Sequence, residues 1–241
     1  MNPNNNILTG RESPYFVELV GLAGAGKSTL AAALVGRTEK VVLTVPPNFH
    51  LARDIPFFIW NSIAMMPTFL GMARESGWKL PSAHEMALMV MLYGWPRRLL
   101  ALPKKECNAL LVDQGPISFL AMLERVNAPW RHTPTGKKWL KKTFERWSSI
   151  ISLVISLDAD NTVLLKRIRT RSQVHRLQTA TDEDAAQTLE LYRKIYPNVI
   201  GCLQSTNTEL KIFSYITTHE DKEKLHLQIA DDLEHALGPE C

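Results

Sequence analysis

The segment Gly21–Ser28, GLAGAGKS, constrains the fold of this 241-residue chain more than any other. Its glycines, lysine and serine match the pattern GxxxxGK[ST], which forms a loop around phosphate groups. The apolar, β-branched run Tyr15–Gly21 precedes this pattern and indicates a buried strand. A helical stretch over 28–35 follows, with Gly36 as its stop signal. A strand, a glycine-rich loop and a helix in this order predict a phosphate-binding turn in an α/β protein.

Each polar or small residue of this loop has a physical task. Gly21 allows a sharp exit from the strand, and Gly26 gives backbone freedom where a side chain would block the phosphate. Backbone N–H groups and the positive end of the helix are expected to surround a β-phosphate. Lys27 is expected to bridge the β- and γ-phosphates, while the Ser28 hydroxyl ligates Mg²⁺. The nucleotide-binding set is therefore predicted to be Gly21, Gly24, Ala25, Gly26, Lys27, Ser28 and Thr29.

Four more apolar runs indicate strands, and helical patterns lie between them. Apolar strands that alternate with helices are typical of a parallel sheet covered on both faces. We therefore predict a single α/β domain over residues 15–241, with a five-stranded parallel sheet, after a flexible lead-in over 1–14. The remaining strands are expected at 41–45, 109–113, 150–157 and 210–216, and helix starts at Ser82–Glu85, Asp160, Thr181–Asp184 and Thr218–Asp221.

The composition excludes several classes of protein. The net charge is 28 − 24 = +4, with 45% apolar and 22% charged residues, which does not fit a disordered chain, a coiled coil or a collagen-like fibre. The most apolar stretch, Ile55–Ala73, contains Pro56, Asn61 and Pro67, so no membrane span is expected. The first 14 residues lack the pattern of a signal peptide. The three cysteines are far apart in the sequence, and together with the lack of a signal-peptide pattern they favour a reducing cytoplasm.

Two further groups of residues are candidates for chemistry at the same sheet edge. Asp113 ends the apolar run LLVD at a strand's carboxyl end, where it can hold Mg²⁺ or accept a proton from an acceptor hydroxyl. Its alternative role is to cap the next helix. Arg167 and Arg171 are four residues apart, which places them on one helix face just after the fourth strand. They are expected to clamp a transferring phosphoryl group, the alternative being a solvated basic face.

Two other segments each have more than one interpretation. Six of the eight methionines lie between Met65 and Met91, where they form an apolar acceptor pocket, a dimer contact or plain core. The segment Trp130–Trp147 combines tryptophans with a lysine stripe. That combination occurs in grooves for single-stranded nucleic acid, but a lysine stripe at helical spacing is also typical of a solvated helix face.

These features together resemble the nucleoside and nucleotide kinase branch of P-loop proteins, closest to thymidylate-kinase-like members. The resemblance implies a three-layer P-loop fold, an acceptor-binding helical region at about 48–108, a lid at about 166–180 and adenine packing on 217–220. The residues that carry it are GLAGAGKST at 21–29, LLVDQGP at 110–116, SLDAD at 156–160, RIRTR at 167–171 and YITTHEDKEKL at 215–225.

Two positions depart from the thymidylate kinase pattern. Thymidylate kinases carry Asp-Arg after the third strand, whereas this chain has Asp113-Gln114. They also carry an arginine-rich Pro-Gly-Gly turn after the second strand, where this chain has VPPN at 45–48. Two arginines that would hold a nucleoside monophosphate are thus missing, and glutamine cannot neutralise a phosphate.

The resemblance and the residues together predict a cytoplasmic ATP-dependent phosphotransferase that moves the γ-phosphoryl group of ATP·Mg²⁺ to a small acceptor. The alternatives are an ATP-hydrolysing switch and a polynucleotide 5′-kinase that uses the Trp130–Trp147 segment. A homodimer is a further expectation. The predicted catalytic residues are Lys27, Asp113, Arg167 and Arg171, and the predicted metal ligands are Ser28 and Asp113.

Overall fold

The computed structural model describes residues 14–37, 41–48, 51–100, 109–171, 176–218 and 221–237. Five strands form one sheet in the order β2-β3-β1-β4-β5, and all four pairings are parallel. The predicted α/β class with a five-stranded parallel sheet is therefore confirmed. The strands are β1 (Tyr15–Gly21), β2 (Val41–Thr44), β3 (Ala109–Asp113), β4 (Ile151–Asp158) and β5 (Lys211–Ile216).

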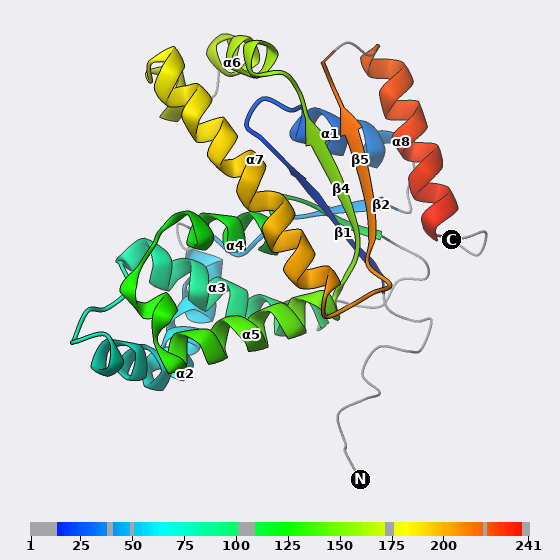
Figure 1. Cartoon of the computed structure of the whole chain (residues 1–241). Coiled ribbons are helices and arrows are strands. Elements are labelled where there is room, and N and C mark those ends of the chain that lie inside the picture. The colour runs from blue at the N-terminus through cyan, green and yellow to red at the C-terminus, as the bar shows by residue number, and fades with distance from the viewer. Residues whose placement is uncertain are drawn as a thin grey trace.

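Helices cover both faces of this sheet and give the molecule three layers (Figure 1). The central strand β1 explains the arrangement, because its side chains alternate between the faces. Val17 and Leu19 pack in one hydrophobic cluster, whereas Phe16 and Val20 pack in another on the opposite face. The α-helices are α1 (Lys27–Arg37), α2 (Ile55–Glu75), α3 (Ala83–Leu100), α4 (Pro116–Arg125), α5 (Pro134–Ser148), α6 (Asn161–Thr170), α7 (Asp182–Gln204) and α8 (Lys222–Leu237), with 3₁₀ turns η1 (Ala52–Asp54), η2 (Pro129–His132) and η3 (Arg176–Gln178).

Two of the predicted helix starts have the expected capping bonds. The Ser82 amide donates to Glu85 Oε2 at 2.9 Å, and the Glu85 amide donates back to Ser82 Oγ at 3.3 Å. The Asp184 amide donates to Thr181 Oγ1 at 3.1 Å, which caps α7. Residues 1–13 of the predicted lead-in, residues 172–175 of the predicted lid and residues 219–220 lie outside the described residues.

Three predicted details of the helices are wrong. Gly36 lies inside α1, which ends at Arg37. Asp160 occupies the N-cap position of α6, but its side chain makes no capping bond to that helix. The residue that caps α8 is Asp221, whose Oδ1 accepts from the Glu223 amide at 3.0 Å. Thr218 is used elsewhere, because its hydroxyl accepts from the Asp160 amide at 2.9 Å.

The methionine and tryptophan segments mainly build the core. Met65, Met72 and Met89 are fully buried, as plain core packing requires. The rings of Trp139 and Trp147 are buried in the same cluster, and that of Trp130 with them. These three rings are therefore not available to stack on nucleic-acid bases, while the lysines of α5 are exposed.

The apolar stretch from Ile55 onward forms one helix that continues through Asn61 and Pro67. The segment Ala52–Glu75 contains an 18-residue stretch with a mean hydropathy of 1.3, so it is long and apolar enough to cross a membrane by length and composition. Within the described residues, however, its inner side is part of the protein core. Met65 and Phe69 are buried there beside α3 and α5.

Candidate nucleotide and acceptor sites

The glycine-rich loop joins the end of β1 to the start of α1. Gly21 has a φ of 149°, and a Cβ there would lie 2.1 Å from the Leu157 carbonyl oxygen of β4. Gly26 has a φ of 96°, a backbone conformation that residues with a side chain rarely adopt. Both glycines therefore allow the chain to turn tightly and present its amides, as the motif predicts.

Lys27 lies within the curve of this loop. Its Nζ donates to the Gly21 carbonyl at 2.9 Å and to the Leu22 carbonyl at 3.0 Å. Burial lowers the pKa of Lys27 from 10.5 to about 8; nearby Arg171 also lowers it, and Asp113 raises it. The ammonium is thus desolvated, and its hydrogen bonds go to carbonyl groups, so an anion in the loop would stabilise its charged form strongly.

Ser28 and Asp113 come together although 85 positions separate them in the sequence. The Ser28 hydroxyl donates to Asp113 Oδ2 at 2.5 Å. The second carboxylate oxygen, Oδ1, is buried and has no hydrogen-bond partner among the described residues. A hydroxyl beside a carboxylate with a free buried oxygen is the kind of oxygen donor set that Mg²⁺ prefers. The residues present therefore fit this ion.

A first cavity of about 330 Å³, here called the donor cavity, extends from the loop to α8. Pockets of this size hold small ligands in proteins. The α8 side of the cavity combines the apolar Leu225 and Ile229 with the polar Lys222 and His226. Besides residues 23–30, the wall consists of Gln114, Leu157, Arg167, Arg171, Thr217, Lys222, Leu225, His226 and Ile229.

The guanidinium of Arg167 lies at one wall of the donor cavity and forms hydrogen bonds with other residues of the chain. Its guanidinium donates to the Gly24 carbonyl at 3.3 Å, to Thr217 Oγ1 at 2.9 Å and to the Thr217 carbonyl at 2.7 Å. The Thr217 hydroxyl in turn donates to the Ala25 carbonyl at 3.2 Å. Arg167 therefore ties α6 to the glycine-rich loop and to the segment after β5.

The prediction that Arg167 and Arg171 share one helix face is wrong, because only Arg167 belongs to a helix. The helix α6 ends at Thr170, and the backbone of Arg171, the next residue, is extended (φ −76°, ψ 146°). The two side chains still line the same cavity. Arg171 is close enough to lower the pKa of Lys27, so it adds positive charge near the loop.

A second cavity of about 230 Å³, here called the acceptor cavity, lies on the other side of Lys27. It shares Ala23, Lys27 and Gln114 with the donor cavity, so the two meet at the loop. The sequence analysis expects an acceptor region at about 48–108, and the described residues of that range that line this cavity belong to α3. Further wall residues are His84, Glu85 and Leu88 of α3, Ser118, Met122 and Arg125 of α4, Arg176 and Leu177 of η3, and Thr188, Leu189, Tyr192 and Tyr196 of α7.

Polar groups in the acceptor cavity come from several elements. The Arg125 guanidinium lies 6.0 Å from the centre of the Tyr192 ring. Glu85 accepts from Trp130 Nε1 at 2.7 Å and from the Ser82 amide at 2.9 Å. Burial alone would raise the pKa of Glu85, but these hydrogen bonds outweigh it and lower the pKa. Glu85 is therefore held as a charged structural group.

Glu18 is a functional candidate that the sequence analysis missed. It is fully buried in β1, and its carboxylate accepts from the amides of Gly115, Ile117 and Ser118 at 3.0, 2.9 and 3.1 Å. Burial raises the pKa of Glu18 to about 8, although these three donors lower it in part. The carboxyl group thus fixes the turn between β3 and α4, which carries Gln114 at a φ of 66°. The signal in the sequence that could have identified Glu18 is that it is the one acid in the otherwise apolar strand β1.

Replacing Glu18 by glutamine is expected to lower the free energy of unfolding by about 1–3 kcal/mol. With a pKa of about 8, Glu18 is mainly protonated at pH 7, and both oxygens of its carboxyl group can still accept. The NH₂ group of a glutamine cannot accept and would face a backbone donor. Urea denaturation measures this loss, with Glu183→Gln on the exposed side of α7 as the control. Equal midpoints for the two variants would show that the buried carboxyl group does not hold the turn.

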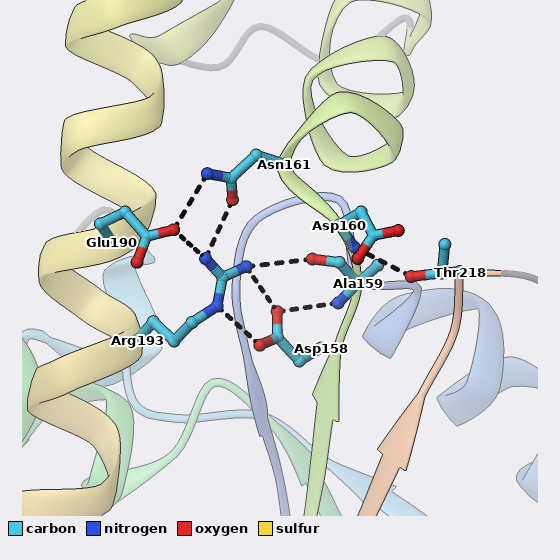
Figure 2. Close-up of polar contacts among 7 residues, drawn as sticks. All are labelled: Asp158, Ala159, Asp160, Asn161, Glu190, Arg193 and Thr218. Carbon is cyan, nitrogen blue, oxygen red and sulfur yellow. Dashed lines mark hydrogen bonds and ion pairs between the residues drawn. The ribbon is translucent and has the colours of Figure 1, made fainter.

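A second network holds the end of β4 against α7 (Figure 2). Arg193 donates from Nε to Asp158 Oδ2 at 2.7 Å and from Nη2 to Asp158 Oδ1 at 3.0 Å. It also reaches the Ala159 carbonyl and Asn161 Oδ1, both at 3.0 Å, and it pairs with Glu190. Hydrogen bonding to Asp158 is the main reason that the pKa of Arg193 is raised. Asp158, the first acid of SLDAD, thus has a structural role, because it joins β4 to α7 through Arg193.

The five-stranded parallel sheet with its glycine-rich loop has the fold of the thymidylate-kinase-like P-loop kinases. Among solved structures, a thymidylate kinase from Candida albicans aligns over 94% of both chains, with a TM-score of 0.55 and 14% identity. A deoxyadenosine kinase from M. mycoides, solved with bound dATP, aligns over 90% of this chain and 98% of its own, with a TM-score of 0.51 and 13% identity. Neither the models of protein families nor the curated protein sequences match this chain.

Proposed function

We propose that the protein is an ATP-dependent kinase that transfers the γ-phosphoryl group to a small acceptor of the nucleoside or nucleotide class. The observation that carries the proposal is the meeting of the donor and acceptor cavities at Lys27 and Gln114. A nucleotide in the first cavity would place its terminal phosphate beside the second one. The names of the two structural neighbours, both kinases of this class, support the same assignment.

The residues of the loop would act by position and charge. The backbone amides over 21–29 would enclose the phosphates, and Lys27 would balance the charge of the β- and γ-oxygens. Ser28 and Asp113 would hold Mg²⁺, which supplies charge neutralisation at the phosphates when bound. Arg171 would add charge at the transferring group, while Arg167 would keep the loop in place through its hydrogen bond to the Gly24 carbonyl.

The wall of the acceptor cavity indicates what kind of acceptor fits. It combines the rings of Tyr192 and Tyr196 with the cations of Arg125 and Arg176. Its acid, Glu85, is occupied by Ser82 and Trp130 and so is not free to act as a base. We propose an acceptor with a flat apolar part and an anionic or strongly hydrogen-bonding part.

An acceptor screen tests this function directly. The protein is incubated with Mg²⁺, ATP labelled on its γ-phosphate and one nucleoside, nucleoside monophosphate or sugar at a time. We expect the label to move to at least one of these small molecules. Release of label to water alone, with every acceptor and at an unchanged rate, would instead favour the ATP-hydrolysing switch.

The affinity for ATP is expected to fall as the pH rises above about 8. In the free protein Lys27 loses its proton near that pH, whereas bound phosphates favour the charged form and raise its pKa. Binding then takes up a proton, and affinity falls by up to about tenfold per pH unit until the pKa of the complex is reached. Calorimetry in two buffers of different ionisation heat measures this uptake.

The matched control for this pH dependence is Lys27→Arg, since a guanidinium does not titrate in this range. Its ATP affinity, whatever its absolute value, should not change between pH 7.5 and pH 9.5. An equal pH dependence in both proteins would assign the effect to another group.

A further inference from the structure

Two arginines of the acceptor cavity lie at its outer end. Among the described residues of the wall, the cations are Lys27, Arg125 and Arg176. Lys27 is buried beside the glycine-rich loop, whereas Arg125 and Arg176 are exposed. The Arg125 guanidinium lies over the ring of Tyr192, but neither arginine has a hydrogen bond or an ion pair within the described part of the chain. Their N–H donors can therefore bind an anion in the cavity.

The wall residues of α4 show how far Arg125 lies from the loop. Ser118, Met122 and Arg125 all line the cavity, and their spacing of four and three residues places them on one face of the helix. Ser118 lies in the first turn of α4, close to Gln114, which both cavities share. Arg125 is the last residue of α4, and the seven residues from 118 to 125 correspond to about 10 Å along the helix axis.

No acid among the described wall residues is available to pair with the two arginines. The one acid of this wall is Glu85, and its carboxylate is already hydrogen-bonded. Glu124, which precedes Arg125 in the sequence, forms an ion pair with Arg131 instead. A guanidinium can donate two parallel hydrogen bonds to a carboxylate or a phosphate. The outer end of the cavity is therefore suited to an anionic oxygen group.

The loop end of the cavity offers no such cation to the acceptor. Lys27 is the cation at this end, and the phosphates of a nucleotide in the donor cavity would engage it. Among the described residues, Arg171 lines the donor cavity and not the acceptor cavity. Gln114 can form hydrogen bonds but carries no charge. The loop end therefore matches a neutral hydroxyl better than a phosphate.

We propose that the acceptor is an alcohol with an anionic oxygen group, a carboxylate or a phosphate, at the end remote from its hydroxyl. Arg125 and Arg176 hold the anion. The half-buried rings of Tyr192 and Tyr196 pack on the part between, and the hydroxyl lies beside Gln114. This inference rests on the proposed kinase activity and adds the charge and orientation of the substrate to it. In the transfer the hydroxyl oxygen bonds to the γ-phosphorus, the bond from that phosphorus to the bridging oxygen breaks, and the products are ADP, a phosphate ester and a proton released to water.

Matched pairs of alcohols test this charge. In the first pair, thymidine is compared with its analogue in which a carboxylate replaces the ring methyl group. In the second pair, a benzyl alcohol with a phosphate ester para to its CH₂OH group is compared with one that carries an uncharged methoxy group there. We expect the anionic member of at least one pair to bind about tenfold more tightly than its neutral partner, and the pair concerned distinguishes a carboxylate from a phosphate. Calorimetry without ATP measures binding, and transfer of labelled phosphate from ATP gives the ratio of kcat/KM within each pair.

Two variants assign the preference to the arginines. Arg125→Gln and Arg176→Gln should each reduce it to less than about threefold, because one of the two cations is lost. The matched control is Lys194→Gln, which removes the same charge from an exposed position of α7 outside both cavities and should keep the full preference. Circular dichroism checks that all three variants are folded.

Equal affinities within both pairs, including no binding of either member, or a preference that persists in both arginine variants, would overturn the proposal. Faster transfer to a nucleoside monophosphate than to any alcohol would also overturn it, although the kinase activity itself would then stand. Transfer to no acceptor at all would instead remove the proposed function, and the calorimetry would still show whether the two arginines hold an anion.

Discussion

Replacing Lys27 by alanine is expected to lower kcat/KM for phosphoryl transfer by about 10³-fold. The reason is that Lys27 is the cation common to both cavities, and its ammonium is buried among carbonyl groups that water does not screen. Transfer of labelled phosphate to the best acceptor of the screen measures the loss. ATP should also no longer raise the midpoint of thermal unfolding.

The stability of the same variant separates a role in binding from a role in folding. A buried ammonium is costly to desolvate, so its removal should not lower the midpoint of unfolding without ATP. Lys224→Ala on the exposed side of α8 is the control, and it should keep both the activity and the ATP effect. If ATP protects Lys27→Ala as well as it protects the wild type, the loop has been assigned wrongly.

The fold and the phosphate loop could be predicted because their signals are local. Residues 21–28 are contiguous, and the conformation that their glycines allow follows from residue type alone. The strands were found within one residue at each end, since buried parallel strands are continuous apolar runs bounded by turn residues. Asp113 was identified because it ends such a run at the edge where the loop also lies.

The acceptor cavity could not be located in the same way. Its wall brings together α3, α4, α7 and η3, which are far apart in the sequence, and no pattern gives how three helices pack. Tyr192 and Tyr196 are four residues apart on α7, but the same spacing occurs in ordinary core helices. The methionines were the more visible signal, and most of them proved to fill the core.

The hydrogen-bond partners of the site residues could not be predicted from the sequence either. Arg167 was predicted as a clamp on the transferring group, yet in this structure its donors are bound to Gly24 and Thr217. Glu18 looked like one irregularity in a strand, although three amides of another element converge on it. A polar side chain in an apolar run is therefore best treated as a sign of a long-range contact.

Replacing Asp113 by asparagine is expected to raise the Mg²⁺ concentration for half-maximal activity and to lower kcat/KM about 10²–10³-fold. Asparagine has nearly the same shape and can still accept from the Ser28 hydroxyl, but it lacks the charge that a divalent cation requires. The free buried oxygen Oδ1 is the specific reason for expecting a metal ligand here. Activity measured against Mg²⁺ at fixed ATP gives the shift.

A neighbouring acid provides the control for this variant. Asp160→Asn also removes one negative charge near the sheet edge, but Asp160 lines neither cavity, so its Mg²⁺ dependence should match that of the wild type. Loss of activity in Asp113→Asn with an unchanged Mg²⁺ requirement would mean that Asp113 takes the acceptor proton rather than holding the metal. In that case Asp113→Asn would show the full loss of kcat/KM with a hydroxyl acceptor, because a hydroxyl must lose a proton to react. With a phosphate acceptor, which is already ionised, the loss would be small.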